Sequence, residues 1–256
     1  MKVTAIPLDI VWSDKSENMF AVANGLSKID KDVDIVVLPE LFSTGFIPDR
    51  QIMSSAAETN NGPTMEALRC WATLYNVAIC GSFLARDGAQ FYNRAFFIEP
   101  SGDETFYDKA HLFGMSNESS LLSVGHRPIP VVRYRGWNIS FIVCYDLRFP
   151  AWCRNMDCKY DLMLIPANWP TTRQYAWTHL LIARAIENQA YYVGCNRTGS
   201  DDCGEYSNEM TFAVDYVGKD ISKSENGMVT VILDKNKIES YREKFPVWRD
   251  SDHFSL

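Results

Sequence analysis

The sequence predicts an α/β fold, because short apolar runs typical of strands alternate with helical periods from one end of its 256 residues to the other. Two pairs of neighbouring strand-like runs, each joined by a tight turn, add antiparallel hairpins to the expected sheets. Hydrophobic residues make up 46% of the chain, which is ample for a buried core. Because no fixed-period repeat, low-complexity tract or linker divides the chain, we expect one domain over residues 1–256, with helices outside layered sheets.

The first third of the chain shows this alternation. Asp14 and Glu17 are a start signal for the first helix. The pattern predicts, in order, a strand at Val3–Ile6, a helix with Met19, Val22, Leu26 and Ile29 on one face, a strand at Asp34–Leu38, a helix with Met65, Leu68, Ala72 and Tyr75 on one side, and a strand at Val77–Ser82. Strands that alternate with helices in this way are typical of an α/β sheet.

The rest of the chain contains the two predicted hairpins, with turns at Pro100–Asp103 and Arg135–Gly136. After them, strands again alternate with a helix. The predicted elements are paired strands at Asn93–Glu99 and Glu104–Asp108, paired strands at Val131–Tyr134 and Trp137–Val143, a strand at Leu162–Pro166, a helix at Trp177–Asn188, and strands at Tyr191–Asn196, Phe212–Val214 and Val229–Leu233. From Lys235 a helix runs to Phe245, and an extended aromatic end follows at Pro246–Trp248. Such a tail exposes apolar surface, so we expect a partner subunit to cover it.

Composition excludes several classes of function. The formal net charge is −7, whereas phosphate binding relies on clustered Lys and Arg, so a nucleic-acid partner is not expected. No stretch approaches transmembrane length, and Met1–Ile6 leads into a polar region rather than into the apolar core of a signal peptide. The seven cysteines form no CxxC pair and cannot all pair within one chain. We therefore expect a cytoplasmic protein with a small-molecule partner.

Cys144 is the first residue that could carry chemistry. It follows the apolar run Ile139–Val143 and precedes a turn at Tyr145–Pro150, and such a junction presents a nucleophile. The backbone N–H of Tyr145 would then point at the oxygen of an attacked carbonyl, as half of an oxyanion hole. The alternative is a buried core cysteine, because thiols are often small hydrophobic groups of the core.

Glu40 and Lys109 are the two charged residues that could assist Cys144. Glu40 ends the apolar run Ile35–Pro39, where a carboxylate must be paired or hydrogen-bonded, and such a carboxylate could take the proton of a thiol. Lys109 follows the strand at Glu104–Asp108 and could stabilise an oxyanion. The alternatives are a Glu that braces a loop and a Lys on the surface.

Histidine offers a different way to activate a thiol, because a Cys–His dyad is a common nucleophile. His111 is the obvious candidate, since it lies two residues after Lys109. No local pattern links it, or His126, His179 or His253, to Cys144. The sequence pattern alone leaves this alternative open.

Read together, three segments resemble the signatures of the nitrilase (carbon–nitrogen hydrolase) superfamily in their order and spacing. These segments are Leu38-Pro39-Glu40, Tyr107-Asp108-Lys109-Ala110-His111-Leu112-Phe113 and Cys144-Tyr145-Asp146-Leu147-Arg148-Phe149-Pro150. The similarity continues through Pro166–Pro170, Ala183–Tyr191 and Gly194–Arg197 and covers almost the whole chain. It implies Cys144 as nucleophile, Glu40 as general base and Lys109 as the residue that stabilises the tetrahedral intermediate. Glu118 matches a second catalytic-site glutamate of the family, which orients the lysine or the attacking water.

Within the superfamily, the chain looks most like the bacterial ω-amidase branch, on the motifs around Cys144 and Lys109 and on the ending Tyr241–Pro246. This resemblance implies hydrolysis of 2-oxoglutaramate and 2-oxosuccinamate, without cofactor or metal. It also implies a four-layer α-β-β-α sandwich and a homodimer formed through its helical layers, with the tail from about residue 235 at the interface. Asp146, Arg148, Glu187 and Asn188 lie in the matching motifs, and we expect them to brace the active-site loop or helix through buried hydrogen bonds.

The substrate's carboxylate calls for an arginine, because a guanidinium binds a carboxylate with two hydrogen bonds. Arg173 is the candidate, with Trp169, Phe42 and Phe113 as walls of the pocket; these four residues could equally belong to the surface or the core. Hydrolysis of N-carbamoyl amino acids or of nitriles would use the same catalytic set. A non-catalytic α/β binding protein with an inert Cys144 is the alternative from another class.

Overall fold

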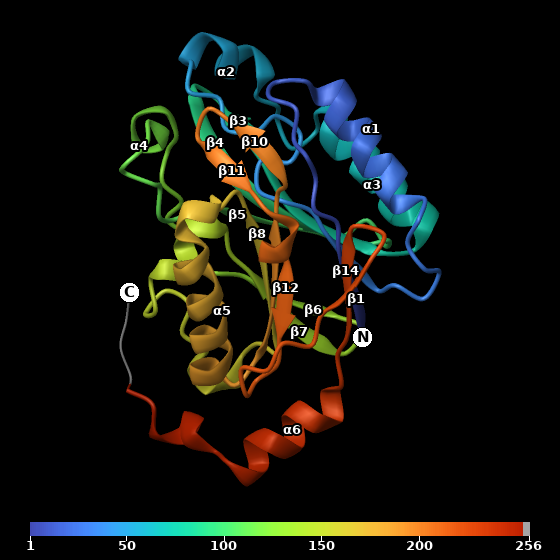
Figure 1. Ribbon diagram of the computed structural model, residues 1–256, viewed down its shortest axis with the longest axis vertical. Coiled ribbons are helices and arrows are strands. Elements are labelled where there is room, and N and C mark those ends of the chain that lie inside the picture. The colour runs from blue at the N-terminus through green and yellow to red at the C-terminus, as the bar shows by residue number, and fades with distance from the viewer. Residues whose placement is uncertain (253–256) are drawn as a thin grey trace.

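The computed structural model describes residues 1–252 of the chain. Its strands form two large sheets and one two-stranded hairpin, and helices cover the outer faces of the two sheets (Figure 1). The layers follow the order helix, sheet, sheet, helix. The predicted four-layer α-β-β-α fold is therefore confirmed.

The first sheet has seven strands in the order β13-β14-β1-β2-β3-β4-β5. Strands β1, β2 and β3 are parallel, whereas β4 and β5 continue the sheet as antiparallel hairpins. Its strands are β1 (Lys2–Ala5), β2 (Ile35–Val37), β3 (Ala78–Asp87), β4 (Gln90–Ile98), β5 (Glu104–Asp108), β13 (Lys223–Glu225) and β14 (Met228–Ile232). Strand β14 returns from the far end of the chain to pair with β1, which the sequence pattern did not indicate.

The second sheet has five strands in the order β12-β9-β8-β7-β6, with β7, β8 and β9 parallel. Its strands are β6 (Val131–Tyr134), β7 (Trp137–Phe141), β8 (Leu162–Ala167), β9 (Tyr191–Asn196) and β12 (Phe212–Val214). The small hairpin consists of β10 (Gly199–Asp201) and β11 (Gly204–Tyr206). Both predicted hairpins, β4–β5 and β6–β7, are present in the expected register around their turns.

The two sheets pack face to face through a shared core. Because successive side chains of a strand point to opposite faces, Ile35 and Val37 lie in the core cluster between the sheets, whereas Val36 packs beneath the outer helices. Helices α1 (Lys15–Leu26) and α3 (Pro63–Tyr75) cover the first sheet, and α5 (Gln174–Asn188) covers the second. The remaining helices are α2 (Arg50–Ala56), α4 (Glu118–Leu121) and α6 (Lys235–Lys244).

The ends of the helices follow local signals. The Asp14 carboxylate caps α1 by accepting a hydrogen bond of 3.0 Å from the backbone N–H of Glu17, as the start signal predicted. The prediction of an extended end after α6 is wrong, since Val247–Asp250 forms a turn of 3₁₀-helix. Residues 253–256, which include His253, lie outside the described residues. None of the helices within residues 1–252 has the length and apolar character needed to cross a membrane.

Candidate active site

The site lies where the parallel strands of both sheets end. Glu40 follows β2 in the first sheet, and Asn168 follows β8 in the second. The backbone N–H of Asn168 donates to Glu40 Oε2 at 2.9 Å, which joins two segments 128 residues apart. Carboxyl ends of parallel strands are the usual place for ligands in such sheets, because the chain leaves the sheet there in loops. The predicted residues Glu40, Lys109, Glu118 and Cys144 all line one cavity of about 330 Å³ at this edge.

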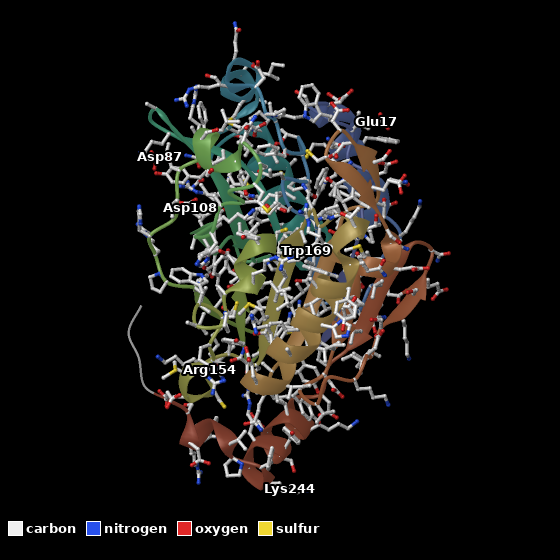
Figure 2. The ribbon with its side chains drawn as sticks, turned by 60° about the vertical axis from the view of Figure 1, so that its left-hand side comes forward. Glu17, Asp87, Asp108, Arg154, Trp169 and Lys244 are labelled. Carbon is white, nitrogen blue, oxygen red and sulfur yellow. The ribbon has the colours of Figure 1, made fainter. Side chains whose placement is uncertain are left out.

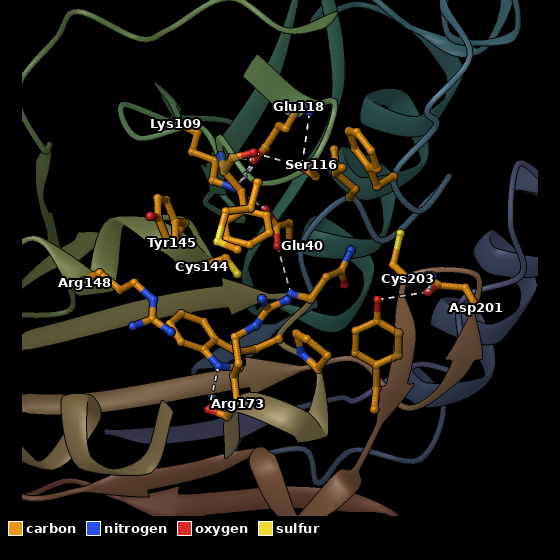
Figure 3. A pocket seen from close by; sticks show the side chains of 18 residues that line it. Glu40, Lys109, Ser116, Glu118, Cys144, Tyr145, Arg148, Arg173, Asp201 and Cys203 are labelled. Carbon is orange, nitrogen blue, oxygen red and sulfur yellow. Dashed lines mark hydrogen bonds and ion pairs between the residues drawn. The ribbon is translucent and has the colours of Figure 1, made fainter. Parts of the chain in front are cut away.

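Three charged side chains form a buried cluster on one side of this cavity (Figure 3). Lys109 Nζ lies 2.8 Å from Glu40 Oε1 and 2.8 Å from Glu118 Oε1. All three side chains are only 3–5% exposed. Two ionised carboxylates buried near each other repel, and the ammonium of Lys109, which contacts both, stabilises them.

The pKa of Lys109 is raised well above its ordinary value. Burial by itself lowers this pKa, but the negative charges of Glu118 and then Glu40 outweigh the loss of solvation. Lys109 is therefore an ammonium group throughout the neutral range. A permanent buried cation beside the nucleophile is suited to hold a developing oxyanion.

The two carboxylates differ in their remaining capacity to accept hydrogen bonds. Glu118 Oε1 accepts from Lys109 and, at 3.4 Å, from Asn93, while its Oε2 accepts from Lys109 at 3.1 Å and from the backbone N–H of Phe113 at 2.6 Å. Because a carboxylate has about four acceptor positions, Glu118 is fully used within the described chain. Glu40 Oε2 has one donor, the Asn168 N–H. Of the two glutamates, Glu40 is the one with an oxygen that can still accept a proton.

Cys144 begins a turn of 3₁₀-helix, η1 (Cys144–Arg148), shortly after β7 ends at Phe141. Its φ of +43° is unusual for a residue with a side chain and marks a sharp, strained turn. Asp146 holds the turn, since its Oδ2 accepts hydrogen bonds from Val143 N–H at 3.1 Å and from the Tyr107 hydroxyl at 2.9 Å. The strained turn aims the thiol into the cavity rather than into the core.

Burial raises the pKa of the Cys144 thiol well above its usual value, and the Glu40 carboxylate raises it further. The charge of Lys109 and the backbone of Asn168 lower this pKa in part. The resting thiol is therefore protonated at neutral pH, and attack requires a group that accepts the proton. Among the hydrogen bonds of residues 1–252, none uses the Tyr145 N–H, so this donor is available to a ligand in the cavity.

His111 does not face this cavity. Its ring Nδ1 lies 2.8 Å from Asp146 Oδ1, its backbone N–H donates to the same oxygen at 2.9 Å, and its ring stacks on Phe149 at 3.7 Å. It lines a separate surface cavity on the other side of the loop. This contact set braces the Lys109 and Cys144 loops against each other and argues against a Cys–His dyad.

The mouth of the cavity carries two arginines, Arg148 and Arg173; in Figure 3, Arg148 lies to the left of Cys144 and Arg173 lies below it. The guanidinium of Arg148 lies over Trp169 at 4.7 Å, and that of Arg173 lies over Phe113 at 4.8 Å. Within residues 1–252, neither guanidinium has a carboxylate within ion-pair distance. Arg148, which we expected to brace the loop, thus belongs to the cavity.

Trp169, Phe113 and Arg173 line the cavity, as the sequence analysis anticipated, but Phe42 does not. Phe42 is fully buried in the core and packs edge to face with Phe96 at 6.1 Å. Its side chain points away from the cavity because Leu41 and the following turn carry the chain back over β3. Trp169 lies near the middle of the molecule (Figure 2), and its indole N–H donates to Arg173 O at 2.9 Å.

Sequence reasoning missed the β10–β11 hairpin and Asn93. Asp201 and Cys203 of the hairpin lie across the cavity from Cys144 (Figure 3), and Tyr206 lines the same cavity. The buried guanidinium of Arg197 pairs with Asp201 at 2.5 Å and thereby anchors the hairpin. No apolar alternation marks this segment, so only a charged pair four residues apart could have indicated it. As for metals, the described part of the chain holds no group of three or more His, Cys, Asp or Glu side chains arranged to bind one.

Comparisons with known proteins agree with this geometry. A model of the carbon–nitrogen hydrolase family matches residues 2–243. A protein of Escherichia coli (strain K12) named omega-amidase YafV is 39% identical over 260 residues, covering 100% of this chain and 98% of that protein. A Bacillus subtilis protein named 2-oxoglutaramate amidase is 32% identical over 253 residues, covering 97% of this chain and 96% of that protein.

A solved structure extends the agreement to the fold. The crystal structure of XC1258 from Xanthomonas campestris, described as a CN-hydrolase superfamily protein, has a TM-score of 0.91 and 33% sequence identity, and the match covers 100% of this chain and 98% of that one. The resemblance found in the sequence is thereby confirmed. The chain belongs to the carbon–nitrogen hydrolase family and is a hydrolase.

Proposed function

We propose that this hydrolase cleaves the terminal amide of small 2-keto acid amides, such as 2-oxoglutaramate and 2-oxosuccinamate, to the dicarboxylate and ammonia. The observation that carries the proposal is the convergence of Cys144, Glu40 and Lys109 in one cavity whose mouth has two arginines. The volume of about 330 Å³ suits a small ligand. The names of the two bacterial relatives described above support the same substrate class.

The first half of the reaction acylates the enzyme. Glu40 takes the proton of Cys144, and the sulfur attacks the amide carbon. Lys109 Nζ and the Tyr145 N–H stabilise the oxyanion of the tetrahedral intermediate. Glu40 then gives its proton to the departing nitrogen, so ammonia leaves and a thioester on Cys144 remains.

The second half regenerates the thiol. Glu40 takes a proton from water, whose oxygen attacks the thioester carbon, and the same two donors hold the second oxyanion. The carbon–sulfur bond breaks, the sulfur regains its proton, and the carboxylic acid product leaves. Glu118 serves this cycle indirectly, since its bonds to Lys109 and to Phe113 N–H keep the ammonium in place.

The two arginines support a substrate that carries a carboxylate. A keto-acid end brings a carboxylate and a neighbouring carbonyl oxygen, and both are acceptors that a guanidinium can bind. Arg173 and Arg148 have no carboxylate partner within residues 1–252, so a bound anion would not have to displace one. Trp169 and Phe113, beneath the guanidinium groups, restrict their positions.

A second candidate is hydrolysis of an N-carbamoyl amino acid. Such a substrate also has a carboxylate for the arginines and a terminal amide-like carbon for Cys144, so the same cavity suits it. A nitrile without a carboxylate would leave both arginines unused. A non-catalytic binding protein would not require the strained Cys144 turn beside a buried Lys–Glu cluster.

The test is ammonia release from 2-oxoglutaramate, with glutamine, an N-carbamoyl amino acid and a simple nitrile as parallel substrates. We expect turnover of the keto-acid amide by the wild type and none by Cys144→Ala, whose fold is checked by thermal unfolding. Preference for another substrate would overturn the substrate assignment and leave the cysteine mechanism standing. Undiminished turnover by Cys144→Ala would overturn the mechanism itself.

The arginines are tested separately with Arg173→Gln and Arg148→Gln. Loss of a charged hydrogen bond to a carboxylate costs about 1.5–3 kcal/mol, so we expect kcat/KM for the keto-acid amide to fall by about 10-fold or more. An uncharged amide of similar length should lose far less. Equal losses for the charged and the uncharged substrate would show that the arginines do not bind the carboxylate.

A further inference from the structure

Asn93 is a buried amide at the centre of the charged cluster. It lies on β4 and is 1% exposed. Its Nδ2 donates to Glu40 Oε1 at 2.7 Å and reaches Glu118 Oε1 at 3.4 Å, while its backbone oxygen accepts from Lys109 N–H at 2.9 Å. One residue thus contacts all three charged residues of the cluster.

The orientation of this amide leaves its own oxygen without a protein partner. Asn93 Oδ1 is buried, and no donor within residues 1–252 reaches it. The reverse orientation would turn that oxygen toward Glu40 Oε1 and place two acceptors against each other. Buried polar atoms are normally paired. Here the Asn93 oxygen is left unpaired while the Asn93 nitrogen donates to two carboxylates, which indicates a role in the site rather than in stability.

The two oxygens of Glu40 differ in their hydrogen-bond partners. Oε1 accepts from Lys109 Nζ and from Asn93 Nδ2, which fills both of its acceptor positions. Oε2 accepts only the Asn168 N–H and keeps one position. With Oε1 held on two sides, the carboxylate cannot rotate, and Oε2 faces the cavity.

We propose that Asn93 is a positioning residue that fixes Glu40 so that Oε2 exchanges the proton with Cys144 and with the leaving ammonia. This inference rests on the proposed role of Glu40 as general base. Asn93 is not among the residues that line the cavity, and its side chain bonds to Glu40 and Glu118, so it acts through Glu40.

The test compares Asn93→Ala with Asn155→Ala in the full chain. Asn155 is also a buried asparagine, 4% exposed, but it bonds to Tyr160 and Asn188 and not to the charged cluster. Two profiles are measured against pH: kcat/KM for 2-oxoglutaramate and the rate of alkylation of Cys144 by iodoacetamide. Alkylation is followed on the Cys144 peptide by mass spectrometry, because the exposed Cys70 and Cys203 also react with iodoacetamide.

For Asn93→Ala we expect kcat/KM to fall about 10- to 100-fold, less than the about 10²- to 10⁴-fold due to loss of the base itself. The rate of Cys144 alkylation should fall as well, because Glu40 is no longer held where it takes the proton of the thiol. Asn155→Ala should lower the unfolding temperature and leave both profiles in place. Asn93→Asp, which keeps the shape but adds a third carboxylate, should not restore activity.

The alkylation profile tests the role of Asn93 independently of the proposed substrate. If the keto-acid amide proves not to be the substrate, the rate of Cys144 alkylation still tests Asn93. An Asn93→Ala variant with an unchanged alkylation rate and a kcat/KM within about twofold of Asn155→Ala would overturn the positioning role.

Discussion

At the scale of single residues, the charged cluster predicts a large effect on stability when its cation is removed. In Lys109→Met, Glu40 and Glu118 would remain buried side by side without a positive charge. Removing one partner of a buried ion pair costs about 3–5 kcal/mol, so we expect a loss of this size in the free energy of unfolding by urea. The control is the double variant Lys109→Met, Glu40→Gln, which should recover part of the loss. A Lys109→Met protein as stable as the wild type would contradict this account.

The same residue also predicts the pH dependence of the thiol. Burial and Glu40 raise the pKa of Cys144, whereas the charge of Lys109 lowers it. Without that charge the pKa rises further, so less thiolate is present at any given pH. We expect iodoacetamide to alkylate Cys144 in Lys109→Met about 10-fold more slowly near pH 8 and to reach the wild-type rate only in more alkaline solution. The unaffected cysteine peptides of the same digest are the internal control, and faster alkylation would contradict the assignment.

Single residues also show what a sequence pattern can reveal. Glu40, Lys109 and Cys144 were recognisable because each interrupts the pattern at the end of a strand, where a charge or a thiol requires an explanation. Asn93 was not, because alternation along a strand does not say which face meets a charged cluster from elsewhere in the chain. Phe42 was misplaced for the same reason, since its neighbours in sequence line the cavity and it does not.

At the scale of elements, the turn η1 depends on Asp146, which accepts hydrogen bonds from His111, Tyr107 and Val143. In Asp146→Asn, an NH₂ group replaces one of the two carboxylate oxygens and faces the donors that this oxygen accepted from. At least one of these hydrogen bonds is therefore lost, which costs about 1–3 kcal/mol of stability. Because the bonds hold the strained Cys144 backbone, kcat should fall together with the unfolding temperature. The control is Asp161→Asn, a buried carboxylate paired with Arg242, which should lower stability and leave kcat in place. Equal kcat values in the two variants would show that Asp146 supports only the fold.

Elements with their own periodicity were predictable, and elements stabilised by distant contacts were not. Helices α1 and α3 carry an apolar face and start signals, so local sequence defines them. The hairpin β10–β11 has no such pattern and depends on the pair between Arg197 and Asp201. An extended end was predicted after α6, yet Val247–Asp250 forms a 3₁₀ turn.

At the scale of the whole molecule, the sequence indicated the fold class but not the way the strands divide between the sheets. The pairing of β1 with β14 joins Thr4 and Thr230, whose hydroxyl oxygens lie 3.0 Å apart across 226 residues. A local pattern shows that a strand has a buried face. It does not show which distant strand pairs with it. The resemblance to a known family supplied the four layers that periodicity alone left open.

The outer face of the molecule over α5 predicts a homodimer. Tyr175 and Ile186 lie on one side of this helix and are 78% and 47% exposed. Val217, which precedes the Gly218 that packs against Ile186, is 48% exposed. Apolar side chains gathered in this way mark an interaction surface, and a second copy that packs helical layer on helical layer would cover them. We expect a dimer in sedimentation at micromolar concentration, and dissociation in the variant Ile186→Glu, because a charge would be buried at the interface. The matched control is Leu74→Glu, which changes an equally apolar residue, 72% exposed, on the opposite helical layer and should leave the dimer intact. A monomeric wild type would contradict the predicted dimer, and a dimer broken by Leu74→Glu and not by Ile186→Glu would place the partner surface elsewhere on the molecule.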